Sequence, residues 1–173
     1  ILIKHEALML GYYKDEQQTN EIIKDGWLYT GDEGSIDNEG FLKITGRVKD
    51  IFKTTKGKYV APTPIEMKLS ENNYIEQVCV VGNGIPQPIA LAVLSENSKN
   101  STDIKSSILK TLDSVNQSLE KHEVINNVVL LKENWTVENK FLTPTMKIKR
   151  NSIEKKYQDN YTTWYEKDKI VEL

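Results

Sequence analysis

The feature that most constrains the fold is a change of pattern at Gly46. Over residues 1–45, short apolar segments alternate with turn residues, and the Asn38-Glu39-Gly40 stretch predicts a hairpin loop. Residues 15–24 favour a short helix, but this first part is mostly β-rich and holds few residues for a core. After Gly46, strand-like and helix-like apolar periods alternate, as in a small α+β domain. We therefore predict two parts, residues 1–45 and residues 46–173.

The second part contains both the two-residue period of strands and the 3.6-residue period of helices. We expect a hairpin around residues 53–58 and three strands, over residues 75–81, 89–94 and 128–131. We also expect three helices. The first is capped by Thr63 and begins at Pro64, the second spans residues 104–119, and the third is amphipathic and starts near Ser152. The predicted fold class is thus α+β, with a β-hairpin and a three-stranded sheet packed with helices.

Composition and charge exclude several classes of function. The formal net charge of -2 offers no broad basic surface for nucleic acid, and no apolar run approaches the roughly 18 residues of a transmembrane helix. A lone cysteine favours a reducing cytoplasm, and Cys79 lies in an apolar run that predicts burial rather than a nucleophile. His5 and His122 lie far apart, so no metal site is expected. Because the sequence opens with Ile1 instead of Met, we expect a piece of a longer protein.

Three clusters of residues could carry chemistry, and each also has a purely structural explanation. The first is Tyr29-Thr30-Gly31-Asp32, where an Asp32 carboxylate could accept hydrogen bonds from the paired hydroxyls of a ribose. A Gly-Asp pair is also a common structural turn. The second is Gly46-Arg47-Val48-Lys49-Asp50, followed by Lys56-Gly57-Lys58. Arg47 could donate to ribose or phosphate oxygens, but basic runs are commonly solvated faces.

The third cluster is the basic stretch of residues 142–150, just ahead of the last predicted helix. A flexible lysine there, Lys147, could reach an anionic transition state. The alternative is a basic helix start held by surface salt bridges. Taken separately, none of the three clusters decides the function.

Together, and in this order, the clusters resemble the C-terminal end of adenylate-forming enzymes, which include acyl-CoA synthetases, nonribosomal peptide adenylation domains and luciferases. Residues 8–32 are similar to the end of the large N-terminal domain of such enzymes. Residues 46–66 resemble the hinge and first hairpin of their small mobile domain. Lys147 through Arg150 resembles the K-x-x-R motif, which carries the lysine of that family's mobile domain.

Within this family, the long-chain acyl-CoA synthetase branch is the most similar. Residues 51–62 and residues 142–147 carry that resemblance. The triplet Thr145-Met146-Lys147 departs from the Ser-Gly-Lys of many members, which leaves the preferred acyl chain length open.

The resemblance implies the organisation and function of the chain. Residues 1–45 would be the C-terminal end of a large AMP-binding N-terminal domain, and residues 46–173 the mobile lid domain. The parent enzyme would be an ATP-dependent fatty acid–CoA ligase that forms acyl-AMP and then acyl-CoA. ATP, coenzyme A and Mg²⁺ would bind largely to the N-terminal domain, so this chain alone would be inactive. Its partners would be that domain and a fatty acid, and peripheral membrane association of the parent enzyme stays open.

The resemblance also implies roles for single residues on the nucleotide side. Lys147 would bridge the acid and the phosphate oxygens of ATP. Asp32 would accept hydrogen bonds from the AMP ribose hydroxyls, and Arg47 would donate on the ribose side.

On the side of coenzyme A, the resemblance implies a hinge at Lys49, about which the small domain turns between two half-reactions. Gly57 lacks a Cβ atom, so its backbone could approach the pantetheine arm closely. Lys56 and Lys58, with Lys53 nearby, could meet the phosphates of coenzyme A.

Two other functions remain open at this point. An adenylation domain could keep the same fold but load its acyl group onto a carrier protein. A noncatalytic binding module could instead use the basic hairpin to engage an acidic partner, in which case Lys147 would be replaceable.

Overall fold

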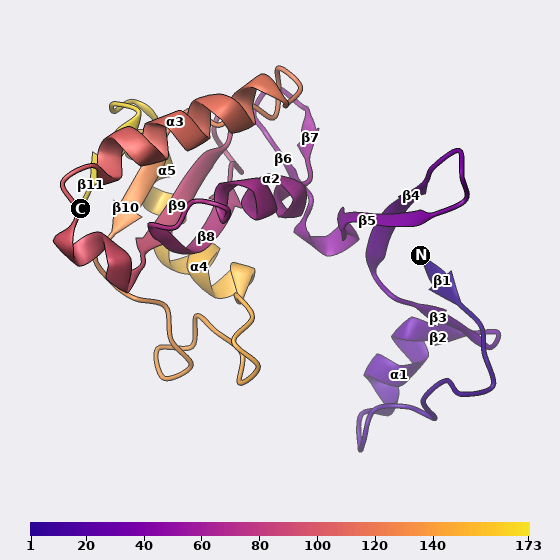
Figure 1. Cartoon of the computed structure of the whole chain (residues 1–173). Helices are drawn as coiled ribbons and strands as arrows, with labels where there is room; N and C mark the ends of the chain where they lie inside the picture. Colours follow the sequence, from indigo (N-terminus) through magenta and orange to yellow (C-terminus); the bar gives the residue numbers. More distant parts are fainter. The chain divides into compact units, whose positions relative to one another are not determined.

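A computed structural model describes residues 1–173, apart from the side chains of Lys99 and Asn100. The chain divides into two compact units, residues 1–49 and residues 50–173 (Figure 1). The division follows Lys49, whereas the sequence pattern changes at Gly46. None of the helices that the structure describes is long and apolar enough to cross a membrane.

The first unit is built from short strands and one helix. A three-stranded antiparallel sheet has the order β1 (Leu2–Ile3), β3 (Trp27–Tyr29) and β2 (Ile23–Lys24). Helix α1 (Glu16–Ile22) begins at Asp15, whose carboxylate accepts a hydrogen bond from the Gln18 N–H at 2.9 Å. This confirms the predicted short helix within residues 15–24.

The predicted hairpin in the first unit is confirmed. Strands β4 (Asp32–Ile36) and β5 (Leu42–Arg47) pair antiparallel around the turn that contains Asn38-Glu39-Gly40. The Asp37 carboxylate holds this turn by accepting hydrogen bonds from two backbone N–H groups, those of Glu39 and Phe41, both at 2.9 Å.

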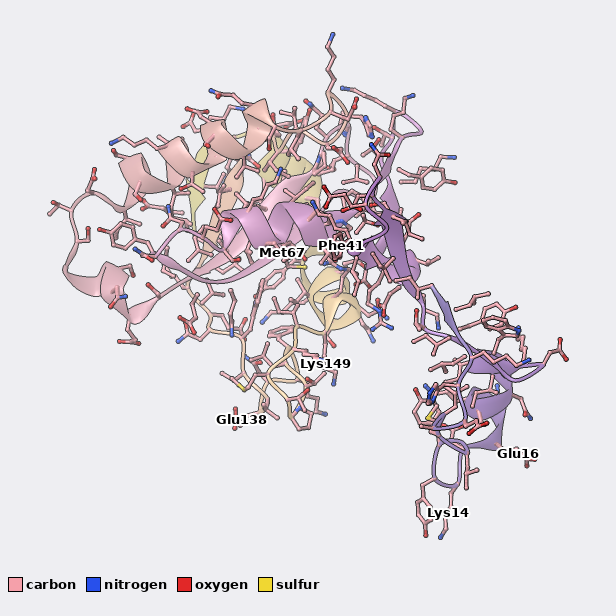
Figure 2. The ribbon with its side chains drawn as sticks, turned by 45° about the vertical axis from the view of Figure 1, so that its right-hand side comes forward. Lys14, Glu16, Phe41, Met67, Glu138 and Lys149 are labelled. Carbon is pink, nitrogen blue, oxygen red and sulfur yellow. The ribbon has the colours of Figure 1, made fainter. Side chains whose placement is uncertain are left out.

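The first unit has almost no core of its own. Gly46 is the one residue of positions 1–49 that is buried, and large apolar side chains such as Leu10, Ile36 and Phe41 are exposed (Phe41 is labelled in Figure 2). A unit that buries so little apolar surface gains little stability from the hydrophobic effect.

The second unit is centred on a four-stranded sheet of order β11-β10-β9-β8. Strands β8 (Ile75–Val81), β9 (Ile89–Leu94) and β10 (Val128–Leu131) confirm the three predicted strands. The fourth strand, β11 (Ile170–Glu172), was not predicted, because a three-residue segment carries too little periodicity. β8 pairs antiparallel with β9, and β9, β10 and β11 run parallel.

Helices cover both faces of this sheet (Figure 1). On one face, α2 (Pro62–Leu69) and α3 (Ile104–Gln117) pack on side chains such as Val80 and Ala90. On the other face, α4 (Arg150–Tyr157) and α5 (Tyr161–Tyr165) pack on Cys79 and Leu91. Neighbouring strand residues alternate between the two faces, as the pleat of a strand requires. The result is an α+β domain of three layers.

The remaining short elements complete the second unit and the segment before it. The 3-10 helix η1 spans Val48–Asp50, strands β6 (Phe52–Lys53) and β7 (Tyr59–Val60) form a second hairpin, and two further 3-10 helices span Glu96–Asn100 and Gln158–Asn160. The β6–β7 hairpin confirms the one predicted around residues 53–58.

Two predicted helix details were wrong. Helix α2 begins at Pro62, not Pro64, and Ala61 rather than Thr63 is its N-cap residue. Both prolines fit the first turn, because the N–H groups there have no helical partner. The tail is not one helix either, since the 3-10 segment Gln158–Asn160 separates α4 from α5.

Candidate functional site

The basic stretch between β10 and α4 ends in a tight hairpin loop, residues 143–147, which we call the lysine loop. Leu142 and Ile148 form an antiparallel bridge at its base. The Thr143 N–H donates to the Lys147 carbonyl at 2.8 Å, and the Met146 N–H donates to the Thr143 carbonyl at 2.8 Å. Met146 has a φ of 61°. A β-turn followed by one left-handed residue is a common three-residue hairpin connection.

The side chain at the end of this loop is available to solvent. Lys147 is exposed, and the side chains that the structure describes include no ion-pair partner for it. Leu142, at the base of the loop, is by contrast 2% exposed. The lysine loop thus presents a cation from an anchored base.

The hairpin β6–β7 ends in a loop of the same geometry, residues 54–58, which we call the glycine loop. The Thr54 N–H donates to the Lys58 carbonyl at 2.9 Å, and the Gly57 N–H donates to the Thr54 carbonyl at 2.9 Å. Gly57 has a φ of 77°, which glycine adopts without a steric penalty. Lys56 and Lys58 are exposed on this loop. Two loops of one domain therefore present lysines after the same backbone turn.

Arg150, the last residue of the K-x-x-R motif, points inward instead. Its Nη2 atom lies 2.6 Å from Glu66 Oε1, and its Nη1 donates to the Val80 carbonyl at 2.7 Å. The Val80 N–H donates to the same Glu66 oxygen at 2.7 Å. Asp50 Oδ2 lies 4.0 Å from Arg150 Nε. We call Arg150 and Glu66 the edge pair, because they bind the free edge of β8.

Burial determines the protonation chemistry around the edge pair. Burial raises the pKa of the Glu66 carboxyl, and the adjacent Arg150 guanidinium opposes that rise. Burial also raises the pKa of the Cys79 thiol, which lies 3.1 Å from Arg150 Nη1. The predicted burial of Cys79 is confirmed.

The two predicted ribose contacts lie together in the first unit. Asp32 begins β4, Arg47 ends β5, and the register pairs them. Arg47 Nε lies 3.2 Å from Asp32 Oδ1, with both side chains partly exposed. Gly31, which directly precedes Asp32 in the chain, has a φ of 75°. The pair offers acceptor oxygens and guanidinium donors side by side.

The predicted hinge residue, Lys49, lies in η1 at the division between the two units. The predicted site residues therefore fall into three places within the chain. Asp32 and Arg47 lie in the first unit, Lys49 lies at its end, and the lysine and glycine loops belong to the second unit.

The sequence pattern did not reveal Glu66 and Thr143 as the partners that hold these loops. One signal was present in the sequence: each loop has a threonine four residues before its last lysine, Thr54 before Lys58 and Thr143 before Lys147.

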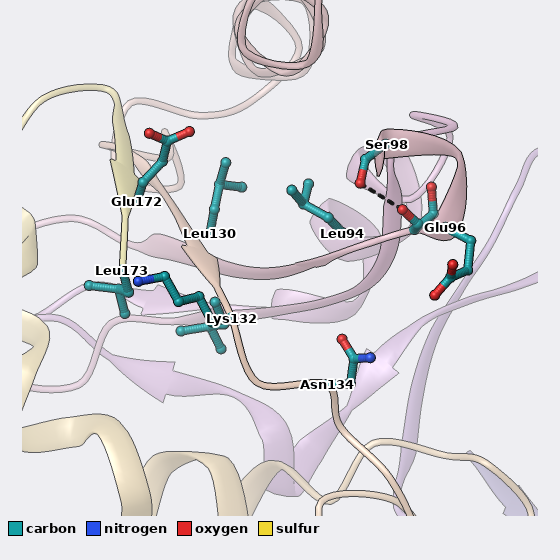
Figure 3. Close-up of a pocket in the computed structure, with 10 residues that line it drawn as sticks. Leu94, Glu96, Ser98, Leu130, Lys132, Asn134, Glu172 and Leu173 are labelled. Atoms are coloured by element: carbon teal, nitrogen blue, oxygen red, sulfur yellow. Dashed lines mark hydrogen bonds between the residues drawn. The ribbon is translucent and has the colours of Figure 1, made fainter. Parts of the chain in front are cut away.

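A separate cavity of about 620 Å³ opens at the carboxyl ends of β9 and β10 (Figure 3). Its lining includes Lys132, Asn134 and Glu172. None of the predicted site residues belongs to its described lining, so this cavity lies apart from the two loops.

The edge pair generates a prediction about stability. Replacing Arg150 by Met should lower the free energy of unfolding by about 3 kcal/mol, because Glu66 would stay buried without its partner. Urea unfolding of the chain measures this change. Lys149→Met, at the exposed neighbouring position, is the control and should cost under about 0.5 kcal/mol. Equal effects of the two substitutions would contradict the assigned role.

The left-handed residue of the lysine loop generates a second prediction. Met146→Val should destabilise the chain by about 1 kcal/mol or more, because a β-branched side chain is strained at a φ of 61°. Met146→Gly removes the same exposed side chain without that strain and should be neutral or stabilising. Urea unfolding compares the two variants, and an equal loss for both would refute the conformation described.

Comparisons with known proteins agree with this architecture. Residues 49–169 match the protein family described as AMP-binding enzyme C-terminal domain. Fatty acyl-CoA synthetase B of Dictyostelium discoideum is 33% identical over 187 residues, which cover 96% of this chain and 28% of that protein. Long-chain-fatty-acid–CoA ligase FadD15 of Mycobacterium tuberculosis is 33% identical, covering 97% of this chain and 31% of that protein. The chain thus spans less than a third of the length of these relatives.

Solved structures show the same fold. The adenylation domain of a carboxylate reductase from Mycobacterium chelonae superposes with a TM-score of 0.79 at 24% identity, covering 96% of this chain and 27% of that chain. The A-PCP didomain of the carboxylic acid reductase from Segniliparus rugosus gives a TM-score of 0.75 at 22% identity, covering 95% and 24%. The solved structures thus show the fold, while the family match and the relatives show that the chain belongs to the AMP-binding enzyme C-terminal domain family of adenylate-forming ligases, with fatty acyl-CoA synthetases among its homologues.

Proposed function

We propose that this chain is the C-terminal part of an ATP-dependent long-chain fatty acid–CoA ligase and works together with a large AMP-binding domain. The observation that carries the proposal is the exposed Lys147 on an anchored hairpin loop, in a chain whose relatives are fatty acyl-CoA synthetases. Residues 1–45 would complete the large domain, and residues 46–173 would act as its mobile lid. The first unit has almost no core, and its exposed apolar side chains need a partner surface. This supports the proposal that it belongs to a larger domain.

The proposed reaction has two half-reactions. In the first, a fatty acid carboxylate attacks the α-phosphorus of ATP, an acyl–phosphate bond forms, and pyrophosphate leaves. In the second, the thiolate of coenzyme A attacks the acyl carbonyl, a thioester forms, and AMP leaves. The first step brings an anion up to a polyphosphate, so it needs a cation at the point of attack. Lys147 is the residue that we assign to this role.

On the nucleotide side, we assign the ribose of AMP to the Asp32–Arg47 pair. Arg47 Nε occupies one side of the Asp32 carboxylate, and a carboxylate has lone pairs left for two hydroxyl donors. The Arg47 guanidinium keeps donors that the ribose oxygens could accept from.

On the side of coenzyme A, we assign the glycine loop. Gly57 has no side chain to block a close approach of the pantetheine arm, and the exposed Lys56 and Lys58 would attract phosphates. Lys49 would be the hinge that lets one loop replace the other between the half-reactions.

The residues of this chain do not fit a Mg²⁺ site. Among the described residues, no group of three His, Cys, Asp or Glu side chains could hold a metal ion. We therefore assign the ligands of Mg²⁺ to the large domain. We also expect the chain alone to be inactive, and a cytoplasmic parent enzyme is consistent with the single reduced Cys79.

An alternative acceptor has support from one comparison. The Segniliparus rugosus didomain joins an adenylation domain to a carrier protein and shares this fold. Carrier loading would use the same first half-reaction, so acceptor assays with coenzyme A and with a carrier protein, on the intact enzyme, discriminate the two functions.

The assignment of Lys147 is tested by substitution in the intact enzyme. Lys147→Ala should slow adenylate formation by about 10²–10³-fold, because it removes a preorganised cation. Thioester formation from supplied acyl-AMP should be preserved. ATP–pyrophosphate exchange measures the first step, and acyl-CoA release measures the second.

The matched control for this experiment is Lys149→Ala, two residues further along the same exposed segment (Figure 2). It removes the same charge without touching the tip and should leave both steps within about twofold. An equal loss of both half-reactions in Lys147→Ala would count against the assignment, as would full adenylation activity.

The hinge assignment has its own test. Proline fixes φ at position 49 and restricts Val48 before it, so Lys49→Pro should hold the lid in one orientation. We expect one half-reaction to be lost while the other continues, measured by the same two assays. Two unimpaired half-reactions in this variant would show that the hinge lies elsewhere.

A further inference from the structure

We propose that Thr143 is a positioning residue that fixes the backbone of Lys147, so that the lysine leaves the loop in one direction. This inference rests on the proposed role of Lys147 and deepens it. Thr143 itself would touch neither ATP nor the fatty acid. It would act through the two backbone groups of the lysine.

The loop geometry creates the need for such a residue. The Thr143 carbonyl already accepts the hydrogen bond of the Met146 N–H, at 2.8 Å. The left-handed Met146 interrupts the antiparallel hydrogen bonding between the two sides of the loop. The Lys147 N–H therefore needs another acceptor. The Thr143 side chain supplies it: the Lys147 N–H donates to Thr143 Oγ1 at 3.0 Å.

Thr143 therefore holds both backbone groups of one residue. Its own N–H donates to the Lys147 carbonyl at 2.8 Å, and its hydroxyl accepts from the Lys147 N–H at 3.0 Å. A second hydroxyl, Thr145 Oγ1, lies 3.0 Å from Thr143 Oγ1 and shares a hydrogen bond with it. The two bonds from Thr143 to Lys147 leave the lysine backbone little freedom, while its side chain stays in solvent.

The glycine loop gives an internal comparison. Thr54 occupies the position of Thr143, and its N–H makes the equivalent bond to the Lys58 carbonyl. Its hydroxyl, however, lies 3.3 Å from that same carbonyl and donates to it. Both loops close in the same way, but in the lysine loop the threonine hydroxyl holds the N–H of the lysine. The extra bond is thus not a requirement for closing such a loop.

The chemistry explains why this bond would matter for one half-reaction. A cation stabilises a developing charge best when it needs no reorganisation at the moment of reaction. A small misplacement of a reacting group can cost a large factor in rate. Fixing the Cα–Cβ direction of Lys147 removes one source of misplacement. Because we assign Lys147 to adenylate formation alone, only that half-reaction should depend on this bond.

The experiment compares Thr143→Val, which removes the hydroxyl at almost unchanged shape, with Thr143→Ser, which keeps it. In the intact enzyme, Thr143→Val should lower the kcat of ATP–pyrophosphate exchange about 5- to 10-fold, the factor that corresponds to one hydrogen bond. Thioester formation from supplied acyl-AMP should stay within about twofold, and Thr143→Ser should restore adenylation. Thr145→Val is the control, because it removes a hydroxyl of the same loop that does not bond Lys147.

A second readout does not depend on activity. Hydrogen exchange of the Lys147 backbone amide, measured on the 173-residue chain, should be faster in Thr143→Val than in Thr143→Ser. Unchanged exchange in Thr143→Val would overturn the proposal. Equal loss of both half-reactions, or failure of Thr143→Ser to restore adenylation, would overturn it as well.

The two hypotheses fail in different ways. If Lys147→Ala keeps full adenylation, the proposed role of Lys147 is wrong, whatever Thr143 does to the amide. If Lys147→Ala abolishes adenylation while Thr143→Val leaves it intact, the role of Lys147 stands and only the positioning role of Thr143 is wrong.

Discussion

The edge pair of Arg150 and Glu66 is the interaction on which the presentation of the lysine loop depends. β8 lies at the edge of the sheet, and the backbone groups of Val80 on that edge would otherwise be unpaired. Glu66 accepts from the Val80 N–H and Arg150 donates to its carbonyl, so the pair makes the bonds that a neighbouring strand would make. Because Arg150 begins α4 and Glu66 belongs to α2, one ion pair joins two helices and the sheet directly behind Lys147.

The number of contacts that hold the segment decreases from the buried Arg150 to the exposed tip of the loop. Arg150 is held in the interior by charge and by hydrogen bonds, where leaving either partner alone is costly. Leu142 and Ile148 close the base of the loop, and the Thr143 bonds hold its turn. The Lys147 side chain extends from this base into solvent. The entropy cost of ordering the Lys147 backbone is therefore met during folding, and only the cost of ordering its side chain remains for the reaction.

Local patterns predicted the local features and failed where distant residues cooperate. The strands β8, β9 and β10, the two hairpins and the burial of Cys79 were predictable, since apolar periods and turn residues act over short distances. The ion pair of Glu66 and Arg150 was not, because its members lie 84 residues apart in the chain. Strand β11 was missed for a similar reason: three residues become a strand only because β10 offers them an edge. The K-x-x-R motif predicted where the lysine loop lies in the chain. The sequence alone could not show that the Arg150 side chain points inward while the Lys147 side chain points outward.

The replacement of the usual glycine by Met146 can be understood from the same loop. A left-handed conformation costs an ordinary residue about 1–2 kcal/mol, while each hydrogen bond across the loop contributes about 1 kcal/mol. Pro144, at the second position of the turn, also restricts the unfolded chain toward the turn conformation. These contributions offset the strain, so Met146 keeps a left-handed conformation that glycine adopts without a steric penalty. What changes is the surface: an exposed thioether now stands beside Lys147 and lines a groove shared with Met67 of α2. The departure from Ser-Gly-Lys therefore places an apolar side chain beside the lysine, at the tip of the loop.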